Sequence, residues 1–128
     1  MQPDVAVEVD GLTKVFRDPV LGEHRAVDGV SFACRYGRVF GLLGPNGAGK
    51  TTTLRMVATV LSPTAGTARV AGHDVAADPD AARARIGFLT ASTGVYERLT
   101  PREILAFFGR LHRMDDERLA ARTGELLD

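Results

Sequence analysis

One glycine-rich stretch, GPNGAGKTTTL at residues 44–54, holds the residues whose types and spacing could do chemistry. Gly44, Gly49, Lys50 and Thr51 fit the pattern G-x-x-x-x-G-K-[ST] of a phosphate-binding loop. Glycines at these positions let successive backbone N–H groups turn inward around anionic oxygens, and the positive end of a following helix points at the same place. The stretch therefore predicts a site for a triphosphate.

Two side chains of the stretch complete this chemistry. The Lys50 ammonium can reach the β- and γ-phosphates of a nucleotide, and the Thr51 hydroxyl can join the oxygen shell of a Mg²⁺ ion. The alternative is a chance match, but the loop follows an apolar run and precedes an amphipathic segment, as the mechanism requires. The predicted phosphate-site residues are Gly44, Pro45, Asn46, Gly47, Ala48, Gly49, Lys50 and Thr51, with Thr51 as the predicted Mg²⁺ ligand.

The segments that must position this loop alternate between strand and helix patterns. Strands are predicted at residues 5–9, 30–36, 38–43, 67–72 and 86–89. The first two alternate apolar and polar residues, with a polar loop predicted between them at 17–25. The runs at 38–43 and 86–89 are continuously apolar, which is typical of strands covered on both faces.

Helix signals follow the loop. Leu54, Val57, Ala58 and Leu61 recur at helical spacing after Lys50 and predict the apolar face of a first helix. Further helices are predicted after an Asp78 cap, from a capping box at 100–103 to about Arg113, and after Asp115. Strands that alternate with helices predict an α/β fold.

Composition narrows the classes of protein. The 128 residues carry 16 basic and 16 acidic side chains, and this neutrality argues against a protein that coats nucleic acid. The single cysteine, Cys34, has no internal disulfide partner and favours a reducing compartment. Its alternating segment favours a buried, inert thiol. The start of the chain lacks the features of a signal peptide, and its longest apolar run is too short to span a membrane.

Two other classes of nucleotide-binding protein fit poorly. A GTPase usually carries an Asn-Lys-x-Asp motif, but Asn46 is the only asparagine in the chain. A small nucleotide kinase normally begins almost directly with the strand before its loop, whereas here the strands predicted at 5–9 and 30–36 come first.

The chain instead resembles the first half of ABC transporter ATP-binding subunits. The segments that carry this resemblance are, in order, VDGLTKVF, AVDGVSF, GRVFGLLGPNGAGKTTTLRMVATVLSPTAGTARVAGHDV, IGFL and VYERLTPRE. The subgroup that serves ABC-2-type exporters, of sodium or drugs for example, is the most similar.

This resemblance implies further roles. ATP and Mg²⁺ become the expected ligands. Phe16 matches the aromatic residue that stacks on adenine, with an ordinary core aromatic as the alternative. Thr52 matches the residue that helps hold the α-phosphate, with a plain first-turn position as the alternative. The three histidines have no metal-ligand spacing among themselves and are interpreted as surface or turn residues.

The resemblance also implies the domain organisation and partners. Residues 1–90 are expected to form a P-loop NTPase core with an N-terminal antiparallel β subdomain. Residues 91–128 are expected to form a coupling loop and the start of a helical subdomain, which together make an incomplete domain. The expected partners are a transmembrane permease, docked between residues 90 and 108, and a second ATP-binding subunit, with no nucleic acid. The expected location is cytoplasmic, peripheral on the inner face of the cell membrane.

The sequence also departs from the family. Ala91 stands where the family has a glutamine that contacts the metal, and nothing resembles the signature loop, the Asp-Glu strand or the switch histidine. We therefore interpret the chain as an N-terminal fragment without a complete catalytic set, in which Lys50 supports the phosphates. The main hypothesis is ATP binding, with hydrolysis in the complete subunit, that energises export. The alternatives are a soluble ABC-type ATPase without a membrane partner and a non-catalytic, truncated nucleotide-binding fragment.

Overall fold

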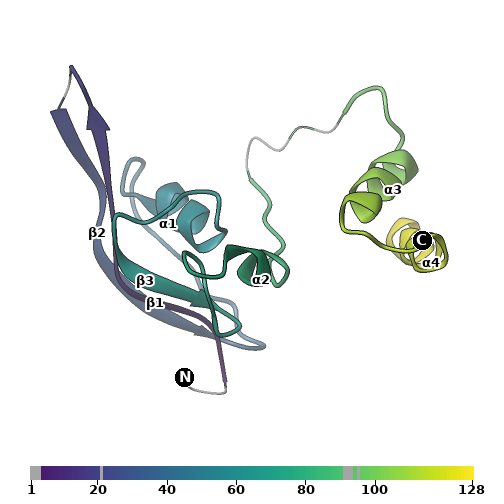
Figure 1. Cartoon of the computed structure of the whole chain (residues 1–128), viewed down its shortest axis with the longest axis horizontal. Coiled ribbons are helices and arrows are strands. Elements are labelled where there is room, and N and C mark those ends of the chain that lie inside the picture. Colours follow the sequence, from purple (N-terminus) through teal and green to yellow (C-terminus); the bar gives the residue numbers. More distant parts are fainter. Residues whose placement is uncertain (1–3, 21, 91–93, 95) are drawn as a thin grey trace. The chain divides into compact units, whose positions relative to one another are not determined.

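The computed structural model describes residues 4–20, 22–90, 94 and 96–128 (Figure 1). The chain divides into two compact units, Met1–Phe88 and Leu89–Asp128, each with its own internal contacts. The predicted division lies close by, between residues 90 and 91. The roles predicted for the two parts stay predictions.

The first unit is built on an antiparallel sheet with the strand order β2-β1-β3-β4. The strands are β1 (Val5–Asp18), β2 (Gly22–Arg35), β3 (Ala65–Val70) and β4 (His73–Asp74). The predicted antiparallel β subdomain is therefore present. The loop predicted at 17–25 is wrong, because β1 and β2 continue as a hairpin in which Phe16 pairs with His24 and Asp18 with Gly22. Cross-strand hydrogen bonds override the polar composition of this segment.

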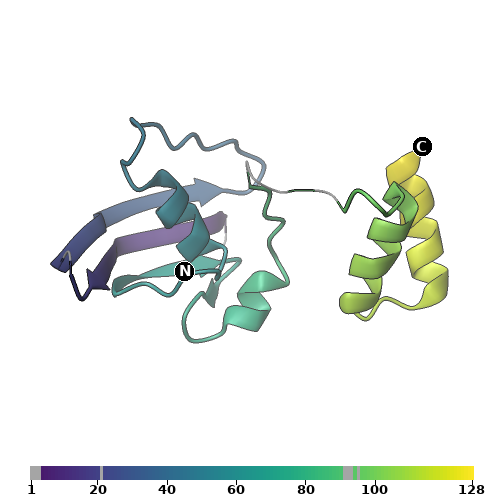
Figure 2. The ribbon, with the colours of Figure 1, turned by 90° about the horizontal axis from the view of Figure 1, so that it is seen from above.

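Two short helices pack against this sheet, α1 (Lys50–Val57) and α2 (Pro79–Arg83). Figure 2 shows α1 lying across one face of the sheet. The core that joins the layers consists of Val9, Leu12, Val27, Met56, Ala68, Val70, Val75 and Ala82. Burial of these apolar side chains fixes α1, and with it the loop from which α1 begins.

The buried face of α1 differs from the predicted one. Val57 and Leu61 pack against the core as expected, but Leu54 is 47% exposed. Met56 is fully buried, and Thr53 is also buried at 2% exposure. The Thr53 hydroxyl donates a hydrogen bond to the Gly49 carbonyl oxygen at 3.0 Å, which satisfies the polar group inside the core.

The strands predicted at 38–43 and 86–89 are not formed. Val39 and Leu43 are 102% and 92% exposed, and Leu89 is 84% exposed. A strand covered on both faces needs hydrogen-bonded neighbours, and among the described residues the ladders join only β1, β2, β3 and β4. Apolar composition alone does not make a strand without a neighbour to pair with.

The second unit is a pair of helices, α3 (Pro101–Leu111) and α4 (Asp116–Leu127), which lie side by side in Figure 2. The predicted capping box is confirmed, since Thr100 and Glu103 cap α3 reciprocally, and Asp115 caps α4 as expected. The helices approach closely at Gly109, where an added Cβ would overlap the Leu119 side chain. Within the described part of the chain, no helix is long and apolar enough to cross a bilayer.

The contact at Gly109 also determines which side of α3 is covered. Neighbouring helix positions point about 100° apart, so helical geometry by itself predicts unequal exposure for Phe107 and Phe108. They are instead 49% and 46% exposed, with ring centroids 5.4 Å apart in an edge-to-face arrangement. Since α4 packs on the Gly109 side, it leaves both rings half uncovered within this unit.

Candidate nucleotide-binding site

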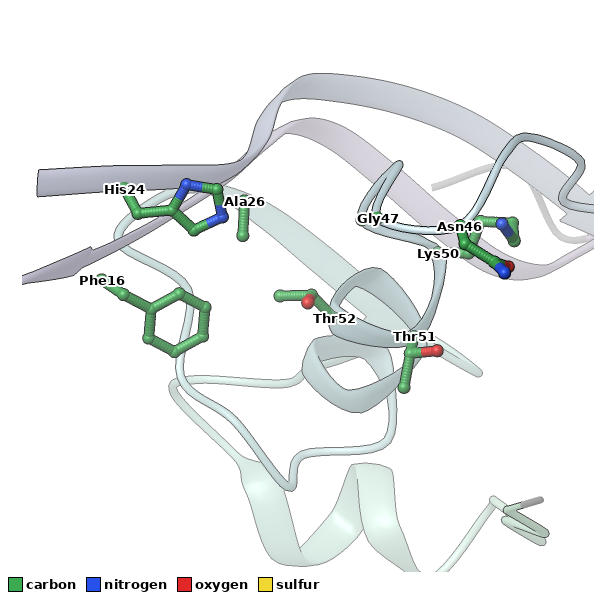
Figure 3. Close-up of a pocket in the computed structure, with 9 residues that line it drawn as sticks. Phe16, His24, Ala26, Asn46, Gly47, Lys50, Thr51 and Thr52 are labelled. Atoms are coloured by element: carbon green, nitrogen blue, oxygen red, sulfur yellow. The ribbon is translucent and has the colours of Figure 1, made fainter. Parts of the chain in front are cut away.

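A cavity of about 330 Å³ lies in the first unit, where the β1–β2 hairpin faces the start of α1. Figure 3 shows its labelled side chains: Phe16 and His24 project from the hairpin, and Thr52 lies across from them on α1. The residues that line the cavity are Phe16, His24, Ala26, Asn46, Gly47, Gly49, Lys50, Thr51 and Thr52. The fold therefore brings Phe16 to the glycine-rich loop although nearly thirty residues separate them in sequence.

Gly49 is the position at which the loop meets the hairpin. Its φ of +83° lies in the left-handed region, and a Cβ built there would overlap the Ala26 carbonyl oxygen. Any side chain at this position would therefore push the loop away from β2. Close approach to the hairpin is what places the start of α1 at the cavity wall.

Lys50 is the first residue of α1, and its side chain folds back over the loop. The ammonium donates hydrogen bonds to the carbonyl oxygens of Gly44 and Pro45, each at 2.6 Å. These contacts account for two predicted site residues, Gly44 and Pro45, that do not themselves line the cavity. Lys50 is thereby held at the loop, beside the cavity that it lines.

The N-terminus of α1 is left open. Gly49 caps it with backbone alone, no side chain makes a capping hydrogen bond there, and the first turn has no acidic residue. The first backbone N–H groups of a helix carry partial positive charge and need acceptors. Thr51 is exposed and Thr52 is half-buried beside these groups. The donor set fits a phosphate group together with a magnesium ion held through the Thr51 hydroxyl.

His24 also lines the cavity, a place that its interpretation as a surface or turn histidine does not include. It is exposed, but it pairs with Phe16 across the hairpin and shares the cavity wall with it. Cross-strand neighbours place their side chains on the same face of a sheet. The length of the hairpin was the missing signal, because the loop predicted at 17–25 would have separated the two residues.

Two other predictions are not brought into the cavity. Ala48 is exposed and does not line it. Ala91, the position of the family's glutamine, lies outside the described residues. Across the described ranges, no group of three or more His, Cys, Asp or Glu side chains could hold a metal ion, so a magnesium site here would depend on ligand oxygens and the Thr51 hydroxyl.

Comparison with known proteins places this chain in a family. The family model described as "ABC transporter" matches residues 27–126. The chain is 47% identical over 127 residues to the daunorubicin/doxorubicin resistance ATP-binding protein DrrA of Streptomyces peucetius, covering 99% of this chain and 37% of that protein. It is 41% identical over 126 residues to the Nod factor export ATP-binding protein I of Paraburkholderia xenovorans, covering 98% of this chain and 40% of that protein.

A solved structure has the same fold. The structure titled "Structure of ATP binding subunit of ABC transporter" superposes with a TM-score of 0.70 at 24% sequence identity, over 88% of this chain and 45% of that one. This likeness shows that the chain shares the fold of an ABC-class ATP-binding subunit. The family match extends this from the fold to the sequence: the chain belongs to the ABC transporter family, as its motifs predicted. The chain spans less than half the length of these relatives.

Proposed function

We propose that this chain binds Mg-ATP through residues 44–52, with Phe16 under the adenine ring. The observation that carries the proposal is the open N-terminus of α1, which shares one cavity with Lys50 and Phe16. Backbone N–H groups and the Lys50 ammonium would hold the phosphates, and the Thr51 hydroxyl would hold the metal. The aromatic ring lies on the far side of the cavity from the loop, as a nucleotide with its base and phosphates extended requires (Figure 3).

The experiment is a titration of a fluorescent ATP analogue against the wild-type chain and Lys50→Ala. Loss of a charge-assisted contact worth about 1.5–3 kcal/mol should weaken binding roughly tenfold to over a hundredfold. Arg55→Ala is the matched control, because it removes a positive charge from the last turn of the same helix, away from the cavity lining. Equal affinity for wild type and Lys50→Ala, with unchanged circular dichroism, would contradict the proposal.

In the complete subunit we propose that ATP binding leads to hydrolysis that energises export. The relatives named for drug resistance and Nod factor export support the transport class. The partners would be a transmembrane permease and a second ATP-binding subunit, on the cytoplasmic face of the membrane. These 128 residues alone should not turn over ATP, because phosphoryl transfer needs a positioned water and further charge stabilisation. A phosphate-release assay tests this, and steady Lys50-dependent turnover of about one per second, within the ordinary range of enzymes, would refute it.

We further propose that the permease docks on the segment between residues 90 and 108. Part of it, at 91–93 and 95, lies outside the described residues. Of the rest, Tyr96 is 59% exposed, and Leu99 and Phe107 line a groove of about 450 Å³ along α3. Exposed apolar side chains that gather in one groove are a common mark of an interaction site. Tyr96→Glu in the full-length subunit should reduce co-purification with the permease without changing ATP affinity, and equal pull-down yields would exclude this surface.

A further inference from the structure

Lys14 is one of only two lysines in the chain, and its contacts differ from those of a solvated surface lysine. It lies half-buried on β1. Its ammonium donates a hydrogen bond to the Ser62 carbonyl oxygen at 2.7 Å. The same nitrogen lies over the Phe16 ring, 5.3 Å from the ring centroid. Lys14 therefore joins the segment that follows α1 to the aromatic wall of the cavity.

The fold fixes both ends of this bridge. Lys14 and Phe16 are two residues apart on a strand, so their side chains project from the same face. Ser62 lies close in sequence to Thr64, whose backbone N–H donates to the Thr13 carbonyl oxygen at 2.8 Å and whose hydroxyl accepts from the Val15 N–H at 3.0 Å. The segment whose carbonyl anchors the ammonium is thus itself tied to β1. Lys14 has little freedom to leave the Phe16 ring.

Phe16 needs such support because it is 41% exposed near the end of its strand. A side chain that must be ordered when a ligand binds lowers the affinity by its ordering cost. A cation over one face of the ring is attracted to the π-electrons and restrains the ring. Lys14 itself is not among the described residues that line the cavity, whereas Phe16 is, so the ring lies between the Lys14 ammonium and the cavity lining.

We propose that Lys14 is a positioning residue that holds the Phe16 ring ready to stack on the base of a nucleotide. The inference rests on the proposed function and adds to it a residue that acts on the base rather than on the phosphates. Lys50 acts on the phosphates, whereas Lys14 acts on the base through Phe16. Substitutions of the two lysines should therefore have different effects when the binding of a complete nucleotide is compared with the binding of its phosphate part alone.

The test is calorimetric titration of the 128-residue chain with ATP and with inorganic tripolyphosphate, both in the presence of magnesium. Lys14→Met keeps the aliphatic stem and removes the charge. It should weaken ATP binding about two- to fivefold, the range of an exposed cation–π contact, and leave tripolyphosphate binding unchanged. Lys14→Arg should restore most of the ATP affinity, because the guanidinium can also lie over the ring. In a Phe16→Ala background, Lys14→Met should have no further effect.

The remaining outcomes overturn the inference. Equal weakening of ATP and tripolyphosphate binding by Lys14→Met would mean that Lys14 acts on the phosphates. Lys50→Met is the reference for that behaviour, because it should weaken the binding of both ligands. Unchanged ATP affinity, or a full effect in the Phe16→Ala background, would mean that the contact with the ring has no role. Retained tripolyphosphate binding reports that each variant is folded. Failure of the wild-type chain to bind either ligand would remove the proposed function as well, and so distinguishes the two.

Discussion

The starts of α1 and α3 show opposite ways of treating the N-terminus of a helix. At α3, the Thr100 hydroxyl accepts from the Glu103 N–H at 3.3 Å, and the Glu103 carboxylate accepts from the Thr100 N–H at 2.8 Å. At α1, Gly49 brings no side chain and the first turn has no carboxylate. The α3 sequence satisfies its own backbone donors. The α1 sequence provides no side-chain acceptor for its own first backbone N–H groups, which leaves them available to a bound anion.

This difference shows that an open helix start is a property of particular residues rather than of helices in general. Asp78 and Asp115 also cap their helices with side-chain oxygens, as Thr100 does. All three helices thus have local acceptors near the positive end of the helix dipole, and α1 alone among the described helices lacks one. An anion bound at α1 would take the place that Glu103 occupies at α3.

The largest effect is expected from a substitution that prevents the loop from lying close to the hairpin. Gly49→Ala should destabilise the first unit by about 2–5 kcal/mol, because left-handed strain adds to overlap with the Ala26 carbonyl. ATP affinity should fall with it. Gly47→Ala is the matched control, since its φ of +84° imposes similar strain but its Cβ meets nothing within 4 Å. Similar losses for both variants, measured by denaturant unfolding, would show that the Ala26 contact does not matter.

The second-largest effect is expected from placing an acidic residue in the first turn of α1, where α3 already has one. Thr52 occupies the third position of α1, as Glu103 does in α3. Thr52→Glu should weaken ATP binding tenfold or more, because a carboxylate near the phosphates repels them by about 1.4 kcal/mol or more. The helix itself should gain about 0.3–1 kcal/mol in stability.

Thr52→Gln is the control for this substitution, because glutamine has the same shape as glutamate without the charge. It should retain most of the ATP affinity. If Thr52→Gln and Thr52→Glu weaken binding equally in a titration, shape rather than charge controls this position, and the open start of α1 is not an anion site.

A smaller effect is expected from opening the start of α3. Thr100→Ala removes the side chain that caps the helix and should cost about 1 kcal/mol of local stability. Hydrogen exchange of the α3 amides measures this, because exchange reports the local opening of a helix. ATP affinity should not change. Unaltered exchange in α3, or altered exchange confined to α1, would contradict the assignment of the cap.

The smallest effect is the dependence of α3 on pH. Hydrogen bonds from the Thr100 backbone N–H and hydroxyl lower the pKa of Glu103 below its ordinary value of 4.5. A carboxyl group whose pKa is lower in the folded state stabilises that state above its unfolded pKa, and this contribution is lost as the pH falls through the folded pKa. The helicity of wild type should therefore exceed that of Glu103→Gln near neutral pH, and the difference should vanish on acidification. If the Glu103 cap did not cause the pH dependence, circular dichroism would show a difference in helicity between wild type and Glu103→Gln that stays constant with pH.

Much of the candidate site, and the cap of α3 as well, could be predicted from the sequence because their signals are local. The phosphate-binding pattern, the helix that starts at Lys50 and the cap at Thr100 all depend on residues within a few positions of one another. Backbone angles and capping hydrogen bonds act over the same short range. These features therefore needed no knowledge of the rest of the fold.

What only the tertiary structure decided depends on contacts between distant segments. The pairing of Phe16 with His24 follows from the register of a hairpin longer than its composition indicates. The need for glycine at position 49 comes from the Ala26 carbonyl, and the setting of the Phe16 ring from a lysine anchored at Ser62. The apolar runs at 38–43 and 86–89 failed as strands for the same reason, because a strand exists only where another segment pairs with it. Such pairing is fixed by register and packing, and those are properties of the folded chain rather than of any short stretch of it.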